Sequence, residues 1–377
     1  MLQASRQWAS RPADERFLSL HEMAAKMRDL RNRSRAVVES SRKIELFPDE
    51  TDATHRGLQL GIGRGPLAGV AMAPTHFSFG QLCSLASPGN SPAGYFRASR
   101  LPAPIIADAL NHNLRFTRAV DEVGLLASLG EDNAVGVPSG TLRAATGPQY
   151  GRVWNADVVG MLIDRFGDGV TGDWRVPGVP GLDPGIRRRV TVDRRNTTLF
   201  ASDRDMFVFL ADEDRRIDVA GRNLARGFFV WNSEEGGKSL GAGFFLFDYV
   251  CANRIVWGAD QYTEVRLRHT KGAPDRWLED VVPVLTEYSE GSARPVVQAI
   301  EEARSRKVGD DLDAFLAVRF GRRMVDPIKA VHLAEEGRPI ETVWDVTVAA
   351  TAHARSVPHT DKRLEIERAA GDLLKTA

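Results

Sequence analysis

Long runs of apolar residues between residues 199 and 270 are the most clearly patterned part of the chain. Met206 to Leu210 are consecutive and apolar, which is typical of a strand buried on both faces. Between Gly227 and Trp277 further apolar runs follow, separated by polar corners. The last of them, residues 263–269, alternates polar and apolar residues as a half-exposed strand does. We therefore predict a central, largely antiparallel sheet from about residue 140 to residue 270.

Helical spacing of apolar residues predicts helices before this sheet. Phe17, Leu20, Met23 and Met27 recur every three or four residues, which favours an amphipathic helix over residues 14–40. Comparable stripes predict helices within residues 77–89 and 95–117, and one that begins after Trp154 with Asn155 or Asp157 as its cap. Residues 48–74 are rich in turn-forming residues, and the segment GIGRGP within them is interpreted as a loop or strand edge.

After Trp277 the apolar spacing is helical to the last residue, which predicts a C-terminal helical bundle. The fold class that follows is α+β, a central sheet with N-terminal helices and a C-terminal bundle. We divide the chain into an N-terminal helical arm (1–45), an α+β core (46–275) and a C-terminal helical region (276–377). The core contains a Gly/Pro-rich stretch near residues 167–189 that is interpreted as an insertion or long loop.

Composition places the chain among ordinary soluble proteins. Of its 377 residues 43% are hydrophobic and 27% are charged, and 50 basic residues balance 50 acidic ones. A formal charge of zero gives no global field toward DNA or a membrane surface. Any contact with nucleic acid must therefore come from local clusters.

Several kinds of site have no signature in the sequence. The two cysteines, Cys83 and Cys251, lie far apart and no zinc spacing is present, so we predict no disulfide framework, no metal and no cofactor. The glycine-rich segment GIGRGP lacks the following Lys-Ser/Thr of a phosphate loop. No secretory leader and no run of eighteen apolar residues is seen, so we expect a cytoplasmic protein without a membrane span.

Five arginines gather within nine residues after the Gly/Pro-rich stretch, and they form the densest basic cluster in the chain. Arginine forks bind phosphate oxygens well, so contact with nucleic acid is one interpretation. Pairing with the acidic residues of the nearby DEDRR segment is the other, and both stay open. The cluster consists of Arg187, Arg188, Arg189, Arg194 and Arg195.

A second basic group lies at the end of the predicted sheet, where Arg266 and Arg268 share the polar face of a strand and Lys271 follows. Tyr249 and Trp257 belong to the same sheet. Cations that follow a backbone beside rings that stack on bases suit single-stranded nucleic acid. The alternative is that these aromatic side chains are simply core.

Signatures of catalysis are weaker. The sequence contains no GxSxG and no HExxH motif, and we predict no catalytic residue and more readily a non-enzyme than an enzyme. Asp248, Asn253, His269 and Glu234 are the polar residues that would have to converge for acid–base chemistry.

Several segments resemble the phage/plasmid-like protein family of unknown function (domain of unknown function nine-three-two). They are TLFASDRDMFVFLADED, RGFFVWNSEEGG, FFLFDYVCANRIVWGA, RLRHTKGAPDRW and LRAATGPQYGRVWNADVV, and the similarity extends over roughly residues 77–374. Members of that family are typical of phages, prophages and plasmids, often beside genes of DNA recombination, replication or anti-restriction. The resemblance implies no established activity and no residue roles.

These observations lead to one main hypothesis and two alternatives. The main hypothesis is a mobile-element accessory protein in a bacterial host that binds nucleic acid, with single-stranded DNA in recombination or annealing as the favoured ligand. It includes self-assembly into a homo-oligomer, which would multiply weak contacts. The first alternative is a non-catalytic partner-binding or host-takeover protein. The second is a hydrolase or nuclease with a site near Asp248 and His269.

Overall fold

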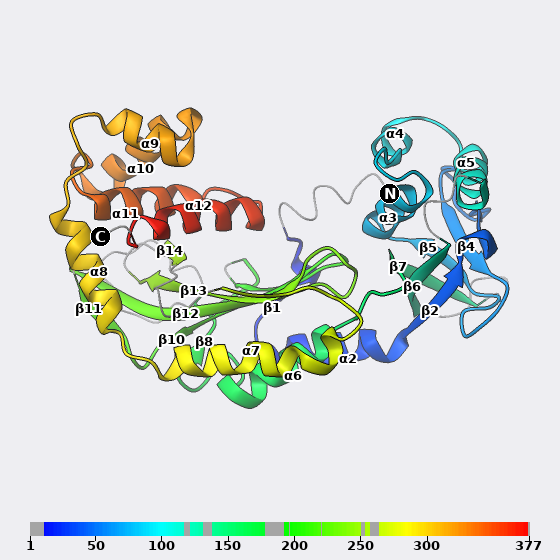
Figure 1. The fold of residues 1–377 in the computed structure, drawn as a ribbon, viewed down its shortest axis with the longest axis horizontal. Coiled ribbons are helices and arrows are strands. Elements are labelled where there is room, and N and C mark those ends of the chain that lie inside the picture. Colours follow the sequence, from blue (N-terminus) through cyan, green and yellow to red (C-terminus); the bar gives the residue numbers. More distant parts are fainter. Residues whose placement is uncertain are drawn as a thin grey trace.

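Two lobes, each built on its own sheet, lie side by side in the molecule (Figure 1). The computed structural model describes residues 11–116, 121–130, 138–177, 192–195, 197–219, 221–249, 253–256 and 264–375. Residues 34–146 form the small lobe, and the residues before and after them form the large lobe. Both sheets are mostly antiparallel and helices pack on them, which confirms the α+β fold class. The boundaries predicted at residues 45/46 and 275/276 fall inside elements, Ile44–Pro48 and Ala273–Glu290.

The sheet of the large lobe has the strand order β1-β9-β10-β12-β13-β14, with β8, β11 and β15 paired to β10, β12 and β13. Its strands are β1 (Arg16–Phe17), β8 (Trp174–Arg175), β9 (Leu199–Ala201), β10 (Met206–Asp212), β11 (Ile217–Val219), β12 (Arg222–Asn232), β13 (Leu240–Asp248), β14 (Asn253–Val256) and β15 (Val265–Leu267). The predicted central sheet is therefore present, although its predicted first part contains β7 (Ser139–Thr146), which belongs to the small lobe.

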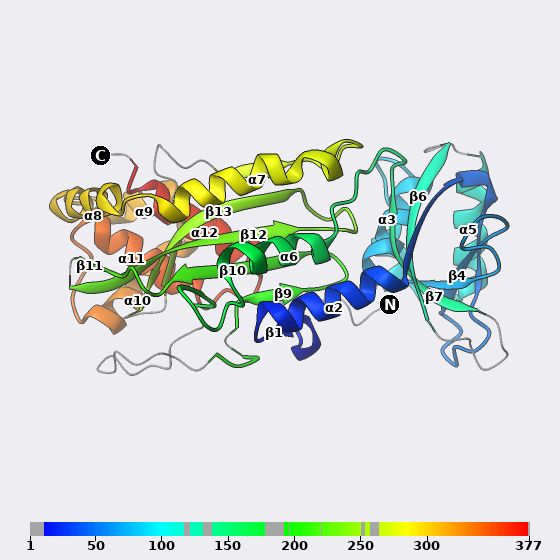
Figure 2. The same cartoon turned by 90° about the horizontal axis from the view of Figure 1, so that it is seen from below.

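Helices cover both faces of the large sheet, which explains the uninterrupted apolar runs. Val208 and Leu210 point into one core and Phe207 and Phe209 into another, because neighbouring residues of a strand face opposite sides. Figure 2 shows the lower face, which is crossed by α2 (Leu20–Arg33), α6 (Asn155–Phe166) and α7 (Ala273–Glu290). The predicted C-terminal helices pack on the other face and beside the end of the sheet, as α8 (Arg294–Ser305), α9 (Leu312–Phe320), the short helix η3 (Arg322–Met324), α10 (Val325–Glu336), α11 (Val343–Ala354) and α12 (Thr360–Asp372).

Aromatic rings on the upper face of this sheet lie over glycines of the neighbouring strand. Trp231 is opposite Gly241, and Phe229 is opposite Gly243. A Cβ atom at Gly241 would lie 2.1 Å from the Trp231 ring, and one at Gly243 would lie 2.7 Å from the Phe229 ring. Each ring therefore occupies the space that a side chain on the facing strand would need.

The small lobe is a second sheet of order β2-β6-β7-β5-β4-β3, with helices on one face. Its strands are β2 (Ser34–Ser40), β3 (Ile44–Pro48), β4 (Leu58–Ile62), β5 (Ala71–Pro74), β6 (Glu122–Leu129) and β7 (Ser139–Thr146), and its helices are α3 (His76–Ala86), α4 (Ala93–Ala98) and α5 (Ala103–Phe116). Its core is mainly aliphatic, with Leu60, Leu125 and Leu142 among the fully buried residues.

This second sheet corrects two expectations. The helix predicted over residues 14–40 ends at Arg33, and β2 follows at once. Residues 48–74, which look turn-rich in the sequence, contain the two strands β4 and β5. In the described ranges, no helix is long and apolar enough to cross a membrane.

Candidate functional site

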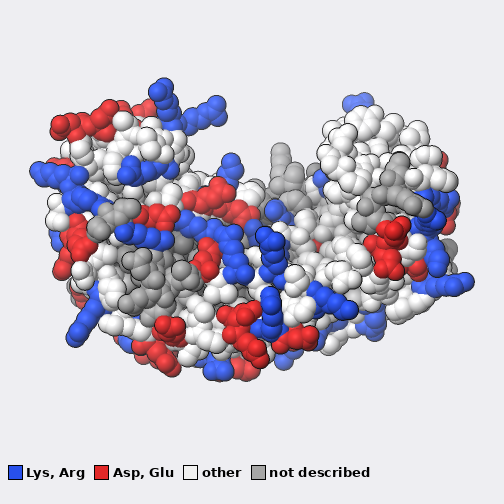
Figure 3. Space-filling model, viewed as in Figure 1, with Lys and Arg blue, Asp and Glu red and all other residues white. Residues whose placement is uncertain are grey.

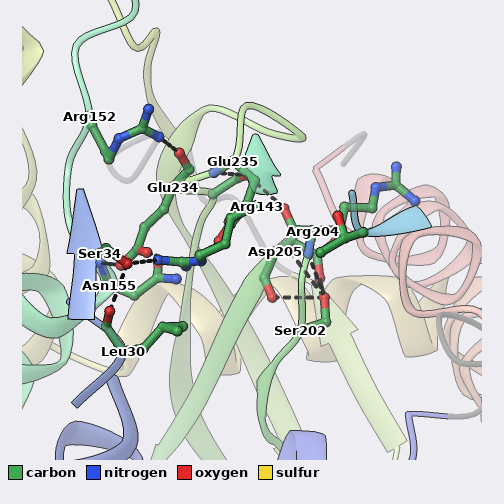
Figure 4. Close-up of polar contacts among 12 residues, drawn as sticks. Leu30, Ser34, Arg143, Arg152, Asn155, Ser202, Arg204, Asp205, Glu234 and Glu235 are labelled. Atoms are coloured by element: carbon green, nitrogen blue, oxygen red, sulfur yellow. Dashed lines mark hydrogen bonds and ion pairs between the residues drawn. The ribbon is translucent and has the colours of Figure 1, made fainter. Parts of the chain in front are cut away.

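The polar corner that follows β12 is buried where the two lobes meet. Asn232, Ser233, Glu234 and Glu235 are each at most 1% exposed, although all four are polar or charged. Removing charged groups from water costs free energy unless partners compensate. The partners come from both lobes, and Figure 4 shows them.

Arg143 supplies the main compensating charge. It lies on β7 of the small lobe, within the otherwise apolar segment LRAAT. Its guanidinium donates to Glu234 Oε2 at 2.5 Å, to Glu235 Oε1, and to Ser34 Oγ at 2.8 Å (Figure 4). One arginine thus bridges the small lobe to two carboxylates of the large lobe.

The corner is also fixed by the segment that leads from β7 into α6. Glu234 Oε1 accepts the N–H of Asn155 at 2.7 Å, which satisfies one of the free N–H groups at the start of α6. This carboxylate takes the role that the sequence suggested for the side chains of Asn155 or Asp157, since α6 has no side-chain cap of its own. Arg152 donates to the Glu234 carbonyl (Figure 4), and the Tyr150 hydroxyl donates to the Ser233 carbonyl at 2.7 Å.

Two more contacts complete the junction. Gln81 of α3 donates to the Glu235 carbonyl at 2.6 Å and accepts the N–H of Ala145 at 3.0 Å. On the other side, Ser233 Oγ donates to the Arg204 carbonyl at 2.6 Å, in the turn before β10. We call the group Ser233, Glu234, Glu235, Arg143 and Arg152 the buried junction.

Burial dominates the acid–base behaviour of the buried junction. It raises the pKa of Glu235 to about 7; the charge of Arg143 opposes this change and that of Glu234 adds to it. Burial also lowers the pKa of Arg143, but the two carboxylates outweigh it and raise that pKa above its usual value. Glu235 Oε2 has no hydrogen-bond partner among the described residues. The junction can therefore take up a proton near neutral pH, but none of the described cavities is lined by its carboxylates.

The four residues considered for acid–base catalysis do not converge. Asp248 pairs with Asn253 at one end of β13, while β15, which leads to His269, pairs with the opposite end. The strand has nine residues, so its two ends are eight residue steps apart, or roughly 26 Å at about 3.3 Å per step. Asp248 is fully buried and binds Arg222 at 2.7 Å. The hypothesis of a catalytic Asp248–His269 pair is therefore wrong.

His269 belongs to the junction between the lobes. Its ring stacks on Tyr150 with centroids 4.8 Å apart, and Nδ1 lies 3.0 Å from the Gly151 carbonyl. Burial lowers the pKa of His269, so the neutral ring donates from Nδ1 to that carbonyl. Arg152, the residue after Gly151, donates to the Glu234 carbonyl, so Glu234 lies in the same region as His269.

An exposed basic group begins next to this junction. Arg266 on β15 and Arg268 and Lys271 in the turn that follows are all exposed; we call these three the basic edge. Arg266 is 60% exposed and bonds Glu264 at 2.9 Å, the carboxylate that Arg368 of α12 also binds. Among the described residues, no ion pair involves Arg268 or Lys271. In the view of Figure 3, basic side chains lie across the middle of the molecule and are interspersed with acidic ones.

The other predicted nucleic-acid residues do not join the basic edge. Arg194 and Arg195 are exposed near β1, at the opposite border of the large sheet, five strand spacings or roughly 24 Å away. Arg194 pairs with Glu22 and donates to the Arg16 carbonyl. Arg187, Arg188, Arg189 and Trp257 lie outside the described residues.

The described aromatic residues of this region, Tyr249 and Trp231, pack against other protein groups. The Tyr249 hydroxyl donates to Glu213, and the Arg216 guanidinium lies 3.9 Å from the centre of the Tyr249 ring. Trp231 is 6% exposed beneath Arg266 and Arg368. The expectation that Tyr249 stacks on bases does not fit this environment, because its ring is already in contact with protein groups.

The sequence pattern does not single out Arg143, Tyr150 or Arg152, although the segment that contains them is one of those that carry the family resemblance. The available signal was a charged residue inside an apolar strand, since a buried arginine requires acidic partners. The adjacent Glu234 and Glu235 in a polar corner were the matching signal. What the sequence did not show is that two separate sheets bring these groups together.

Comparison of the chain with protein-family models, with curated proteins and with solved structures finds no match. Within the described residues, no group of three or more His, Cys, Asp or Glu side chains is arranged to hold a metal ion.

Proposed function

We propose that the protein binds nucleic acid, with single-stranded DNA as the favoured ligand, through the basic edge formed by Arg266, Arg268 and Lys271. The observation that supports this most is the exposure of three cations along one strand and its following turn, in a protein whose formal net charge is zero. A role as a phage or plasmid accessory protein in recombination or annealing rests on the sequence resemblance alone and is part of the same proposal.

The surroundings of the basic edge favour contact with a sugar–phosphate backbone. Lys271 and Arg268 have no acidic partner among the described residues, so a phosphate does not have to displace one. Arg368 extends the charge toward α12. Trp231, the aromatic residue beneath Arg266, is only 6% exposed, so binding is expected to depend on phosphates and little on base identity.

The position of the basic edge is consistent with a strand lying between the lobes. The turn after β15 touches the segment between β7 and α6, where the Gly151 N–H donates to the His269 carbonyl at 3.0 Å. Figure 3 shows that the surface is hollowed between the two lobes. A flexible single strand can follow such a hollow more easily than a stiff duplex.

Binding of a fluorescently labelled oligonucleotide, measured by anisotropy, tests the proposal. Three phosphate contacts on a single strand predict a log–log salt slope of about −2, or a loss of affinity of about 20-fold between 50 and 200 mM salt. The double variant Arg268→Glu/Lys271→Glu should abolish binding at 50 mM salt.

The matched control is Arg322→Glu/Arg323→Glu, which makes the same change in net charge at two exposed arginines of the helix η3. This control should bind as the unmodified protein does. Equal losses in both variants, or no binding by the unmodified protein at 50 mM salt, would contradict the proposal. A duplex competitor that binds as tightly as the single strand would overturn the preference for single strands.

A further inference from the structure

The two borders of the small sheet differ in how they are closed. At β3 a side chain of α5 occupies the border: Asn111 accepts the N–H of Leu46 at 2.8 Å and donates to the Leu46 carbonyl at 2.7 Å. The Asn111 side-chain amide thus makes the two hydrogen bonds to Leu46 that a further neighbouring strand would make. An unpaired strand border otherwise offers a template to another chain, and proteins commonly block it.

At β2, on the opposite border, no such blocking group is present among the described residues. β2 pairs with β6 without a bulge from Ser34 to Ser40, and it contains no proline and no lysine. The Ser41 N–H continues this ladder by donating to the Asp121 carbonyl at 3.0 Å, so the odd-numbered residues bond to β6. The even-numbered residues, Ala36 and Val38 among them, therefore direct their N–H and C=O groups outward.

This open border is also accessible. Ala36 is exposed, and the Val38 side chain is among the exposed large apolar ones at 54%. The two ends of the strand are partly satisfied locally, because Arg35 donates to the Ser34 carbonyl and Glu39 accepts the Ser40 N–H. The centre, Ala36 to Val38, is left as the part that can pair.

We propose that β2 pairs in antiparallel fashion with β2 of a second copy of this chain, about a two-fold axis at Val37, so that the two small sheets become one continuous sheet. The sequence SRAVVES is self-complementary in this register. Arg35 lies opposite Glu39 of the second copy, Ala36 lies opposite Val38, and serines face each other at the ends. The interface is isologous, as expected of a two-fold dimer.

Charge selects this register over its neighbours. Pairing that keeps the outward groups bonded can shift only in steps of two residues. One such shift centres the axis on Ala36 and places Arg35 opposite Val37; the other centres it on Val38 and places Arg35 opposite Ser41. Both shifts lose the Arg35–Glu39 pairs and shorten the ladder. A foreign peptide could use the same border, but the symmetric placement of opposite charges favours a second copy.

The oligomeric state is the first test, by sedimentation velocity of the full chain over a range of concentrations. Arg35→Glu and Glu39→Arg should each weaken the dimer by at least tenfold, because like charges then face each other, and the double variant Arg35→Glu/Glu39→Arg should restore it. Restoration would show that the single variants had not simply misfolded. A protein that is monomeric at all concentrations, or a dimer that is indifferent to these changes, would overturn the proposal.

A cysteine substitution tests the register directly. Val37 faces Val37 across the axis as a non-hydrogen-bonded pair, whose Cα atoms lie about 4.5 Å apart, within the range of a disulfide. Val37→Cys should therefore give a reducible covalent dimer under mild oxidation, beyond what the unmodified chain with its own two cysteines gives. The matched control is Val318→Cys, at a valine of α9 that is 82% exposed.

Cross-linking at Val38→Cys but not at Val37→Cys would indicate the shifted register and reject the proposed axis. The inference does not rest on nucleic-acid binding: the basic edge lies in the large lobe, so failure of one proposal leaves the other intact.

Discussion

The two sheets of this protein are stabilised in different ways. The large sheet is buried between helices on both faces, and its aromatic rings lie over glycines on the neighbouring strands. The small sheet has a mainly aliphatic core on one face. Asn111 closes its β3 border by hydrogen bonds, whereas the described residues leave its β2 border open. Between the two sheets lies a junction of buried charge rather than an apolar interface. The lobes therefore have separate cores, and polar groups at the junction hold them in their relative position.

The largest expected effect comes from removing the charge that joins the lobes. Arg143→Ala leaves Glu234 and Glu235 buried without their main partner, and breaking such a buried ion pair costs about 3–5 kcal/mol. Denaturant unfolding should be followed by tryptophan fluorescence and by circular dichroism. Residues 34–146 contain no tryptophan, so fluorescence reports the large lobe alone. We expect the two signals to separate in the variant.

Arg115→Ala, at an exposed arginine of the small lobe, serves as the control and should change stability by less than about 0.5 kcal/mol. Adding Glu234→Gln and Glu235→Gln to Arg143→Ala should recover part of the loss. An Arg143→Ala protein as stable as the control would show that the junction does not hold the lobes together.

The second effect is a pH dependence that belongs to the junction. The pKa of Glu235 is about 7 in the folded protein, against a usual value near 4.5, so the folded state holds the proton more tightly. Its contribution is fully present below pH 4.5 and is lost as the pH rises through 7. The size of this change is about 3 kcal/mol, from about 1.4 kcal/mol for each unit of pKa.

The measurement is the unfolding free energy from pH 4.5 to pH 8 for the unmodified protein and for Glu235→Gln, which resembles the protonated form. As the pH rises from 4.5 to 7, the unmodified protein should lose about 3 kcal/mol of unfolding free energy relative to Glu235→Gln, and above pH 7 the difference should stay constant. Glu15, whose pKa burial raises to about 8, leaves a slope of the same sign in both proteins. Parallel curves would refute the assignment to Glu235.

The third effect tests the close packing of aromatic rings on glycines in the large sheet against an open position in a helix of the same lobe. In Gly241→Ala the new Cβ would lie 2.1 Å from the Trp231 ring and 2.6 Å from the Val265 carbonyl oxygen, and such overpacking should cost about 2–3 kcal/mol. Gly160→Ala, in α6 of the same lobe, meets nothing within 4 Å and should stabilise by about 0.5–1 kcal/mol. Thermal unfolding measures both, and equal effects would show that the ring does not need the space.

The smallest effect concerns the border of the small sheet. Asn111→Ala removes both hydrogen bonds to Leu46 and should cost about 1–2 kcal/mol, because water replaces them in part at a border. Hydrogen exchange at the Leu46 amide should accelerate, while that at Leu60 on the inner neighbour β4 should change less. Unchanged exchange at Leu46 would show that Asn111 does not close this border.

How much of this was predictable differs between the lobes. Met206 to Leu210 forecast a strand buried on both faces, because such a strand needs apolar residues at every position. The helical stripe of Ile106 and Leu110 likewise forecast α5. The strand Leu58–Ile62 was overlooked because its alternation is short and contains Gly61, which favours a turn in local propensity.

The candidate site was predictable only in part, since it depends on tertiary placement. The exposure of Arg266 follows from the alternation of its strand. The separation of Asp248 from His269 does not, because it depends on which end of β13 each neighbouring strand joins. In the same way, an arginine inside an apolar strand indicates that acidic partners must be present, but it does not show that Glu234 and Glu235 are those partners. The hydrophobic pattern of the sequence predicts the helices and strands, whereas the site depends on which distant strands pair with one another.

The small lobe is inserted between α2 and α6, and both chain crossings lie next to each other. Arg31, near the end of α2, pairs with Asp157 of α6 and lies 5.3 Å from the Trp154 ring centre. Contacts of the large lobe here close a loop of more than one hundred residues, which is entropically costly for an unfolded segment. If the small lobe folds first, it brings its own two ends together, and this lowers the entropic cost of forming the contacts between α2 and α6. We expect it to lead the folding order, with amide protection in β6 and β7 appearing before protection in α6 during pulse-labelled refolding.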